Sequence, residues 1–176
     1  AVDKINRYDE VYQLLRGKVI SGEWGELRSM YIQKPGIGLG CLGTHSFDQA
    51  NFIFGRMPSR VSAWIDPVLG SNPRGEQFRD PGGLVVLDYG GPKAIISQIE
   101  DGAGPQTLEL HFAGAKVYHD PKNEVLDIRI RDRSVTPGPG RPPKYFNFEI
   151  PTGLRIRSDM LQQISRVIEN LLSDDI

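Results

Sequence analysis

The sequence predicts an α+β domain built on a large, mostly antiparallel and open β-sheet, with helices packed on one face. Two observations carry this prediction. Gly and Pro supply 20 and 13 of the 176 residues, which breaks the chain often with turns and favours strands over long helices. Between positions 60 and 150, apolar runs separated by turn residues follow one another without a helical pattern. Strands that lack crossover helices pair mainly antiparallel.

The predicted elements follow in order along one domain, 1–176. A first helix covers about 9–21, because Val11, Leu15 and Val19 recur at helical spacing and Gly22 can end it. A half-polar strand follows at 25–34, and a short helix opens at Thr44 as N-cap and ends at Gly55. Seven further strands are predicted at 60–65, 84–89, 94–100, 107–112, 115–119, 125–131 and 145–150. A last helix at 158–172 is expected to close one face of the sheet.

Composition and charge exclude several classes of protein. Hydrophobic residues make up 39% of the chain and charged residues 24%, as in ordinary globular domains. A net charge of −1 gives no general attraction to nucleic acid or to an acidic membrane. The single Cys41 cannot form an internal disulfide, and no apolar run reaches about 18 residues. We therefore expect a cytoplasmic protein with no membrane or nucleic-acid partner.

A glycine-rich segment, Gly38-Leu-Gly-Cys-Leu-Gly43, spells the dinucleotide-binding fingerprint and lies between a strand and a helix. The strand before it is half polar, and no parallel βα units follow to build a nucleotide crevice. The sequence therefore favours a packing role, in which small residues allow a tight turn and a close helix. This chain alone is expected to bind neither NAD nor NADP.

His45 is the first candidate for chemistry. It falls in the first turn of the predicted helix, where the partial positive charge of the helix end favours a neutral imidazole that can act as a base. Asp48 lies on the same side and could orient it. A solvated histidine at a helix start explains the pattern as well. No metal site is expected, because His45, His111 and His119 are far apart and no CxxC occurs.

A basic segment with interleaved aromatics, 129–157, is the second candidate. It could bind a phosphate backbone and stack bases. The alternation of Arg129, Arg131 and Arg133 with Ile128 and Ile130 more plainly describes a strand with a solvated outer face.

Several short motifs together resemble the second domain of the glucose-fructose oxidoreductase and inositol dehydrogenase (Gfo/Idh/MocA) family. They are Asn6-Arg7-Tyr8, Ile20-Ser-Gly-Glu-Trp-Gly-Glu-Leu27 and Gly40-Cys-Leu-Gly-Thr-His-Ser-Phe-Asp48, with Gly55, Asp80 and Gly91. The sharpest resembles the family's Asp-x-Gly-x-His-x-x-Asp segment, with Cys41 at the first Asp.

The resemblance implies the C-terminal domain of an NAD(P)-dependent oxidoreductase that acts on a sugar, polyol or similar hydroxyl or ketone. The nucleotide-binding (Rossmann) domain would precede residue 1, so this chain alone is expected to be inactive. His45 would be the catalytic residue, and Cys41, Asp48, Lys34 and Arg7 the substrate-binding candidates. NAD or NADP would bind only in the full-length parent.

The resemblance also implies a homo-oligomer formed through the open sheet face. The apolar side chains expected to need cover there are Val125, Ile128, Tyr145 and Phe148. Two alternatives remain: a non-catalytic dimerisation or scaffold domain, which Cys41 in place of an acid favours, and a small anion- or nucleic-acid-binding module.

Overall fold

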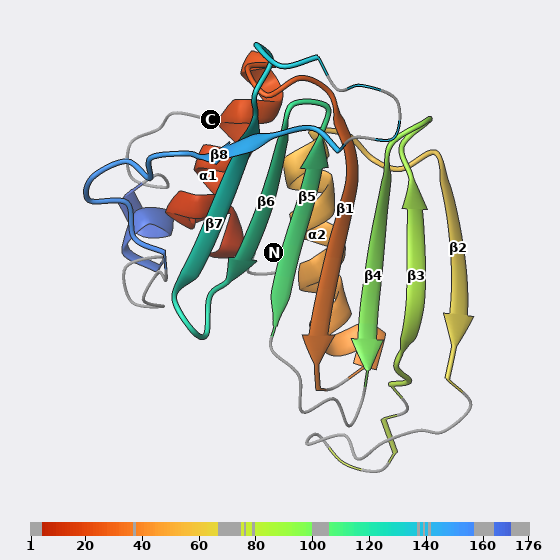
Figure 1. The fold of residues 1–176 in the computed structure, drawn as a ribbon. Helices are drawn as coiled ribbons and strands as arrows, with labels where there is room; N and C mark the ends of the chain where they lie inside the picture. The colour runs from red at the N-terminus through yellow and green to blue at the C-terminus, as the bar shows by residue number, and fades with distance from the viewer. Residues whose placement is uncertain are drawn as a thin grey trace.

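The computed structural model describes residues 5–36, 38–66, 75, 77–78, 80–99, 106–136, 138, 140, 142–156 and 164–169. Eight strands form one sheet in the order β2-β3-β4-β1-β5-β6-β7-β8 (Figure 1). The strands are β1 (Leu27–Pro35), β2 (Arg60–Ile65), β3 (Gly83–Asp88), β4 (Lys93–Ile99), β5 (Thr107–Phe112), β6 (Ala115–Asp120), β7 (Val125–Arg131) and β8 (Tyr145–Asn147). The predicted α+β class is confirmed, and every predicted strand is present.

The sheet is antiparallel except at its centre. β1 pairs parallel with β4 on one side and antiparallel with β5 on the other. The remaining pairs are all antiparallel hairpin or meander neighbours. The first strand of the chain thus lies in the middle of the sheet, between strands that come much later. Parallel neighbours such as β1 and β4 need a long connection between them. The chain provides it with α2 and the strands that follow β1.

Two helices cover one face of the sheet and the other face is open (Figure 1). α1 (Glu10–Ser21) begins at the N-cap Asp9, whose carboxylate accepts a hydrogen bond from the backbone N–H of Val11, and ends at Gly22 in the left-handed conformation. α2 (Gly43–Phe54) ends at Gly55 in the same conformation. Residues 164–169 are helical, and the rest of the helix predicted at 158–172 lies outside the described residues.

The core lies between these helices and the sheet. α1 contributes Val11 and Leu15, and α2 contributes Ala50 and Ile53, all fully buried. The alternating residues of the central strands face them, as the burial pattern of β1 shows. These strand residues include Met30, Ile32, Ala94, Ile96, Leu110 and Val117.

The open face carries a mixture of apolar and charged side chains, and it differs from the prediction at two residues. Ile128 is 1% exposed and belongs to the core, because it pairs with Val117 on the helix-covered face. Phe148 packs edge to face on Trp24 and is half buried. Val125 and Tyr145 are exposed as expected.

The apolar part of the open face lies on the other half of the sheet. Trp64 is opposite Leu84, and Tyr31 is beside Ile95. Trp64 is the most exposed of these, at 62%. Together with Val86 these residues form what we call the open-face patch: Tyr31, Trp64, Leu84, Val86 and Ile95.

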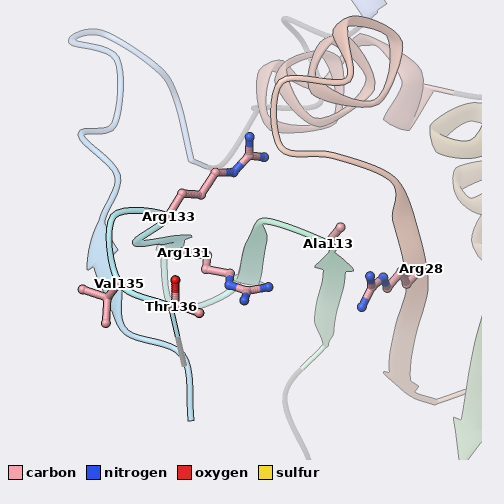
Figure 2. Close-up of a pocket in the computed structure, with 6 residues that line it drawn as sticks. All are labelled: Arg28, Ala113, Arg131, Arg133, Val135 and Thr136. Atoms are coloured by element: carbon pink, nitrogen blue, oxygen red, sulfur yellow. The ribbon is translucent and has the colours of Figure 1, made fainter. Parts of the chain in front are cut away.

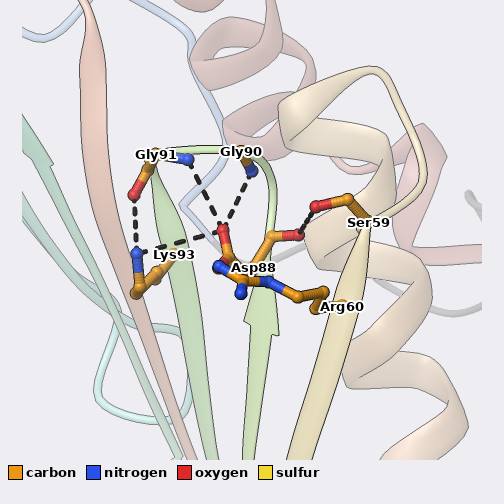
Figure 3. Close-up of polar contacts among 6 residues, drawn as sticks. All are labelled: Ser59, Arg60, Asp88, Gly90, Gly91 and Lys93. Atoms are coloured by element: carbon orange, nitrogen blue, oxygen red, sulfur yellow. Dashed lines mark hydrogen bonds and ion pairs between the residues drawn. The ribbon is translucent and has the colours of Figure 1, made fainter.

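The junction of β2, β3 and β4 is held by Asp88 (Figure 3). Its carboxylate accepts hydrogen bonds from the backbone N–H of Gly90 at 2.9 Å and from Arg60 at 2.7 Å. These bonds, the Gly90 bond first, lower the pKa of Asp88. The backbone carbonyl of Asp88 accepts from both the backbone N–H and the hydroxyl of Ser59. The short turn after β3 is therefore fixed by a single residue.

No helix within the described residues is long and apolar enough to cross a membrane. Within the same residues, no group of three or more His, Cys, Asp or Glu side chains is placed to hold a metal ion.

Candidate active site

The start of α2 lies at the end of the sheet where β1 and β4 finish (Figure 1). A π-helical turn, Gly38–Leu42, leads directly into the helix. Leu42 is the N-cap residue and supplies no side-chain hydrogen bond, so the prediction of Thr44 as N-cap is wrong. The Thr44 hydroxyl instead donates to the backbone carbonyl of Cys41 at 3.0 Å. The physical reason is that the helical run begins earlier than the sequence pattern suggests.

Asp80 caps this run from another part of the chain. Its carboxylate accepts hydrogen bonds from the backbone N–H of Gly40 at 2.5 Å and of Cys41 at 2.7 Å. The backbone N–H of Leu39 donates to the carbonyl of Pro81 at 2.9 Å. A helix start leaves unpaired N–H groups that favour an anion. Here the anion is a carboxylate of the protein itself.

The glycines of this turn allow the two segments to approach. A Cβ atom on Gly38 would lie 2.0 Å from the backbone oxygen of Asp80, and one on Gly40 would lie 3.0 Å from its carboxylate. The prediction of a packing role is therefore correct, although the glycines pack against the segment at 80–81. The hydrogen bonds to Asp80 also decide whether this turn could bind the phosphates of a dinucleotide. Two of the N–H groups that would cradle a phosphate already bind Asp80, so this turn does not fit a dinucleotide.

Arg7 and Asp48 form the second feature of the site, although they are 41 positions apart. Arg7 lies in a short 3₁₀ helix, η1 (Ile5–Tyr8), which precedes α1. Its Nε and Nη2 atoms donate to the two carboxylate oxygens of Asp48 at 2.9 and 2.5 Å. This hydrogen bond raises the pKa of Arg7. Asp48 is 8% exposed, whereas 46% of the Arg7 side chain is exposed. The pair therefore presents a guanidinium, not a carboxylate, to solvent.

His45 is half exposed in the first turn of α2. Asp48 lies one turn further along the same helix, as the sequence pattern predicts. The hydrogen bonds that the structure gives to the Asp48 carboxylate come from Arg7. The structure thus brings together Arg7, His45 and Asp48 around the start of α2, and the role of each in chemistry remains a prediction.

Lys34 lies at the end of β1 on the helix-covered face, opposite Gln98 of β4. It is 7% exposed, and its burial lowers the pKa to about 8. A lysine with such a pKa exists partly as a neutral amine at slightly alkaline pH and can then accept a proton. Cys41 is a half-buried free thiol in the π-helical turn before α2. This turn contacts β4. Both residues therefore belong to the same end of the sheet as His45.

Two features of the site were not predicted from the sequence. Asp80 gave no local signal for capping, because its partners are 40 and 39 positions away. The Arg7–Asp48 pair joins a 3₁₀ helix to a different helix, and opposite charges at such separation have no sequence pattern. Two hints were available for Asp80: the Asp80-Pro81 dipeptide, which is typical of a fixed turn, and the place of Asp80 among the residues that carry the family resemblance.

Comparison with known proteins finds neither a matching family model nor a similar curated protein. Solved structures with a similar fold do exist. A Desulfitobacterium hafniense protein assigned as an NADPH-dependent oxidoreductase matches with a TM-score of 0.67 and 14% identity, over 97% of this chain and 55% of its own. An oxidoreductase from Bacillus cereus matches at 0.66 and 14%, over 98% and 57%. An NAD-binding oxidoreductase from Klebsiella pneumoniae matches at 0.62 and 16%, over 81% and 45%.

The chain therefore has the fold of one part of these oxidoreductases, and it spans about half of their length. At such low identity the similarity concerns the fold alone.

Proposed function

We propose that this chain is the substrate-side domain of an NAD(P)-dependent oxidoreductase that oxidises a hydroxyl group of a sugar, polyol or similar molecule, or reduces the corresponding ketone. The observation that carries the proposal is the match of 97% of the chain to about half of an assigned NADPH-dependent oxidoreductase, with a second match of 81% of the chain to about half of an NAD-binding one. The turn before α2 does not fit a dinucleotide, so the cofactor would be bound by another part of the parent.

His45 is the proposed proton-transfer residue. The nicotinamide supplies hydride exchange when it is bound. On this chain, a neutral imidazole at the helix start accepts the proton of the substrate hydroxyl as the C–H bond gives up its hydride, and returns it in the reverse reaction.

The other candidates would bind the substrate. Two N–H groups of Arg7 are bound to Asp48, which leaves further N–H groups on the exposed side of the guanidinium to donate to substrate hydroxyls. Asp48 would position Arg7. Lys34 and Cys41 would contribute an amine and a thiol on the sheet side of the same site.

The proposal is tested on the full-length parent by following NAD(P)H absorbance with a panel of polyols and ketones. His45→Gln should lower turnover by roughly 10²- to 10⁴-fold, because glutamine keeps a polar side chain but cannot exchange a proton. Arg56→Gln, just beyond the opposite end of α2, is the matched control and should leave turnover unchanged. Full activity of His45→Gln would reject the assignment.

A binding test on this chain alone separates the two halves of the proposal. Titration calorimetry should detect no binding of NAD or NADP, because Asp80 occupies the N–H groups of the only glycine fingerprint. A micromolar dissociation constant for either cofactor would reject the claim that the cofactor site lies elsewhere.

We also propose that the open sheet face mediates self-association. The open-face patch presents aromatic and branched side chains on a surface that the helices leave uncovered. Light scattering should show a dimer or larger species, and Trp64→Glu should shift it towards monomer. Ile20→Glu is the matched control, since Ile20 is 70% exposed on α1. A monomeric wild type at about 100 μM would contradict the proposal.

A scaffold domain without catalysis is the second candidate, because Cys41 stands where the resembled family has an acid. A neutral thiol cannot make the charge-assisted hydrogen bond that a carboxylate makes to a hydroxyl. A parent that self-associates but turns over none of the panel, even as Cys41→Asp, would favour this candidate.

A further inference from the structure

A basic pocket lies at the end of the sheet opposite to the candidate active site. It is formed where β1 begins, β5 turns into β6 and β7 ends, and its volume is about 360 Å³. Its lining residues are Arg28, Ala113, Arg131, Arg133, Val135 and Thr136. Among the described residues, the pocket is lined by three guanidinium groups and one hydroxyl, and by no carboxylate.

The arrangement of the arginines is fixed by the fold. Arg28 is at a bulge in β1, between the pairs that Leu27 and Ser29 make with β5. Arg131 is the last residue of β7, and its backbone N–H donates to the carbonyl of Gly114 at 2.8 Å. Figure 2 shows the guanidinium groups of Arg28 and Arg131 turned towards each other across the β5–β6 turn, with Arg133 extending away from them. The Arg133 guanidinium lies close to Gly114, where an added Cβ atom would be 3.0 Å from it.

These arginines differ from others on the same sheet. Arg129 donates to Asp127 at 2.9 Å, and Arg60 donates to Asp88 at 2.7 Å. In the part of the chain that the structure describes, the side chains of Arg28, Arg131 and Arg133 form no hydrogen bond or ion pair. The one acid in the adjoining loop, Asp132, accepts hydrogen bonds from the backbone N–H and hydroxyl of Ser134 instead. The pocket therefore holds positive charge that the described protein groups do not balance.

The donor groups that line this pocket indicate which class of ligand it can bind. Guanidinium and hydroxyl groups supply many donors, so the ligand must be an anion rich in acceptor oxygens. One planar carboxylate is matched by one guanidinium fork. Two guanidinium groups that approach from opposite sides are better matched by a tetrahedral phosphoryl group, whose oxygens point in several directions. We propose that the pocket between Arg28 and Arg131 binds a phosphoryl group of a small anionic ligand.

Calorimetric titration of the chain with inorganic pyrophosphate tests the proposal, with about 150 mM NaCl present to screen weak surface attraction. Saturable binding is expected. Arg28→Gln and Arg131→Gln should each weaken it by about tenfold or more, because each removes a charge-assisted fork. Arg131→Lys should weaken it less, because lysine keeps the charge but loses the fork. Malonate should bind more weakly than pyrophosphate.

Arg60→Gln is the matched control, because Arg60 also projects from the open face but is already paired with Asp88. It should leave pyrophosphate binding unchanged. An equal loss in Arg60→Gln and Arg131→Gln would indicate unspecific attraction and overturn the proposal. Absence of saturable binding up to about 10 mM, a concentration well above millimolar dissociation constants, would also overturn it. Thermal unfolding of each variant in the absence of ligand shows that the fold is retained.

Discussion

Replacement of Asp80 tests whether a single carboxylate holds the start of α2 in place. Asp80→Ala removes two hydrogen bonds from a charged acceptor to backbone N–H groups, those of Gly40 and Cys41. Each such bond contributes roughly 1.5 to 3 kcal/mol when it is buried. Gly40 is exposed and Cys41 half buried, so water can partly replace the carboxylate. We therefore expect a loss of about 2 to 3 kcal/mol, at or above the upper end of measured capping effects, which reach about 2 kcal/mol for a single N-cap.

The assay is urea denaturation followed by circular dichroism, with thermal unfolding as a second measure. For a domain of this size, the loss corresponds to a fall in Tm of roughly 4 to 12 °C. Asp80→Asn keeps one acceptor oxygen and should lose about half as much. Asp127→Ala, which removes a half-exposed carboxylate paired with Arg129, is the control and should change stability by less than about 1 kcal/mol.

Amide hydrogen exchange at Gly40 and Cys41 gives the local result. Both amides should exchange faster in Asp80→Ala, while the exchange of the central strands changes only with global stability. The carboxylate does not hold the turn if the free energy of unfolding of Asp80→Ala is within about 0.5 kcal/mol of the wild-type value and the exchange rates of these two amides are unchanged.

The remaining predictions concern pH and close packing. Burial lowers the pKa of His119, so the unfolded state binds the extra proton more readily, and stability should fall as pH drops below the unfolded pKa of about 6.5. His119→Gln should flatten this fall, as measured by urea unfolding from pH 5 to 8; an unchanged pH dependence would contradict the argument. Burial lowers the pKa of Lys34 to about 8, so the unfolded state binds the proton more readily and stability should fall as pH drops from about 10 to 8. Lys34→Met should therefore be more stable than the wild type at pH 7. Equal stability of the two proteins at pH 7 would contradict the burial argument. Gly38→Ala should lower the free energy of unfolding by about 2 kcal/mol or more, because the added Cβ would meet the carbonyl oxygen of Asp80 at 2.0 Å. Gly17→Ala is the matched control: it has open space around it in α1 and should raise the free energy of unfolding by about 0.5 to 1 kcal/mol.

Local patterns in the sequence predicted most of the fold. Val11, Leu15 and the terminal Gly22 were enough to predict α1, and the alternation in 125–131 was enough for β7. The parallel pairing of β1 with β4 was not predictable, because nothing local distinguishes a strand with two distant partners. Ile128 was placed on the wrong face, although the alternation of Leu126, Ile128 and Ile130 with Asp127, Arg129 and Arg131 gathers the apolar residues on one side of β7, which is the side that meets the helices.

The candidate site was predicted in parts. His45 and Asp48 share a helix, so their proximity follows from helical spacing. The partner of Asp48 is Arg7, which is supplied by another element and depends on how α1 and α2 pack. Lys34 was proposed from a resemblance, and its burial could be known only from the packing at the end of β1.

The central position of β1 has a consequence for how the chain is made. β1 ends at residue 35, whereas its two neighbours begin at residues 93 and 107. During synthesis one edge of this strand, which carries Met30 and Ile32 on one face, stays unpaired until the ribosome has extended the chain through β4 at Ile99, and the other edge stays unpaired until β5 is complete at Phe112. Unpaired edges with apolar faces invite pairing with other chains. Distant pairing also slows folding, because the connecting loop must close before contacts form. α1 is already made when β1 emerges, and α2 follows directly after it, so both helices are available to cover the apolar face of the strand before the sheet closes around it.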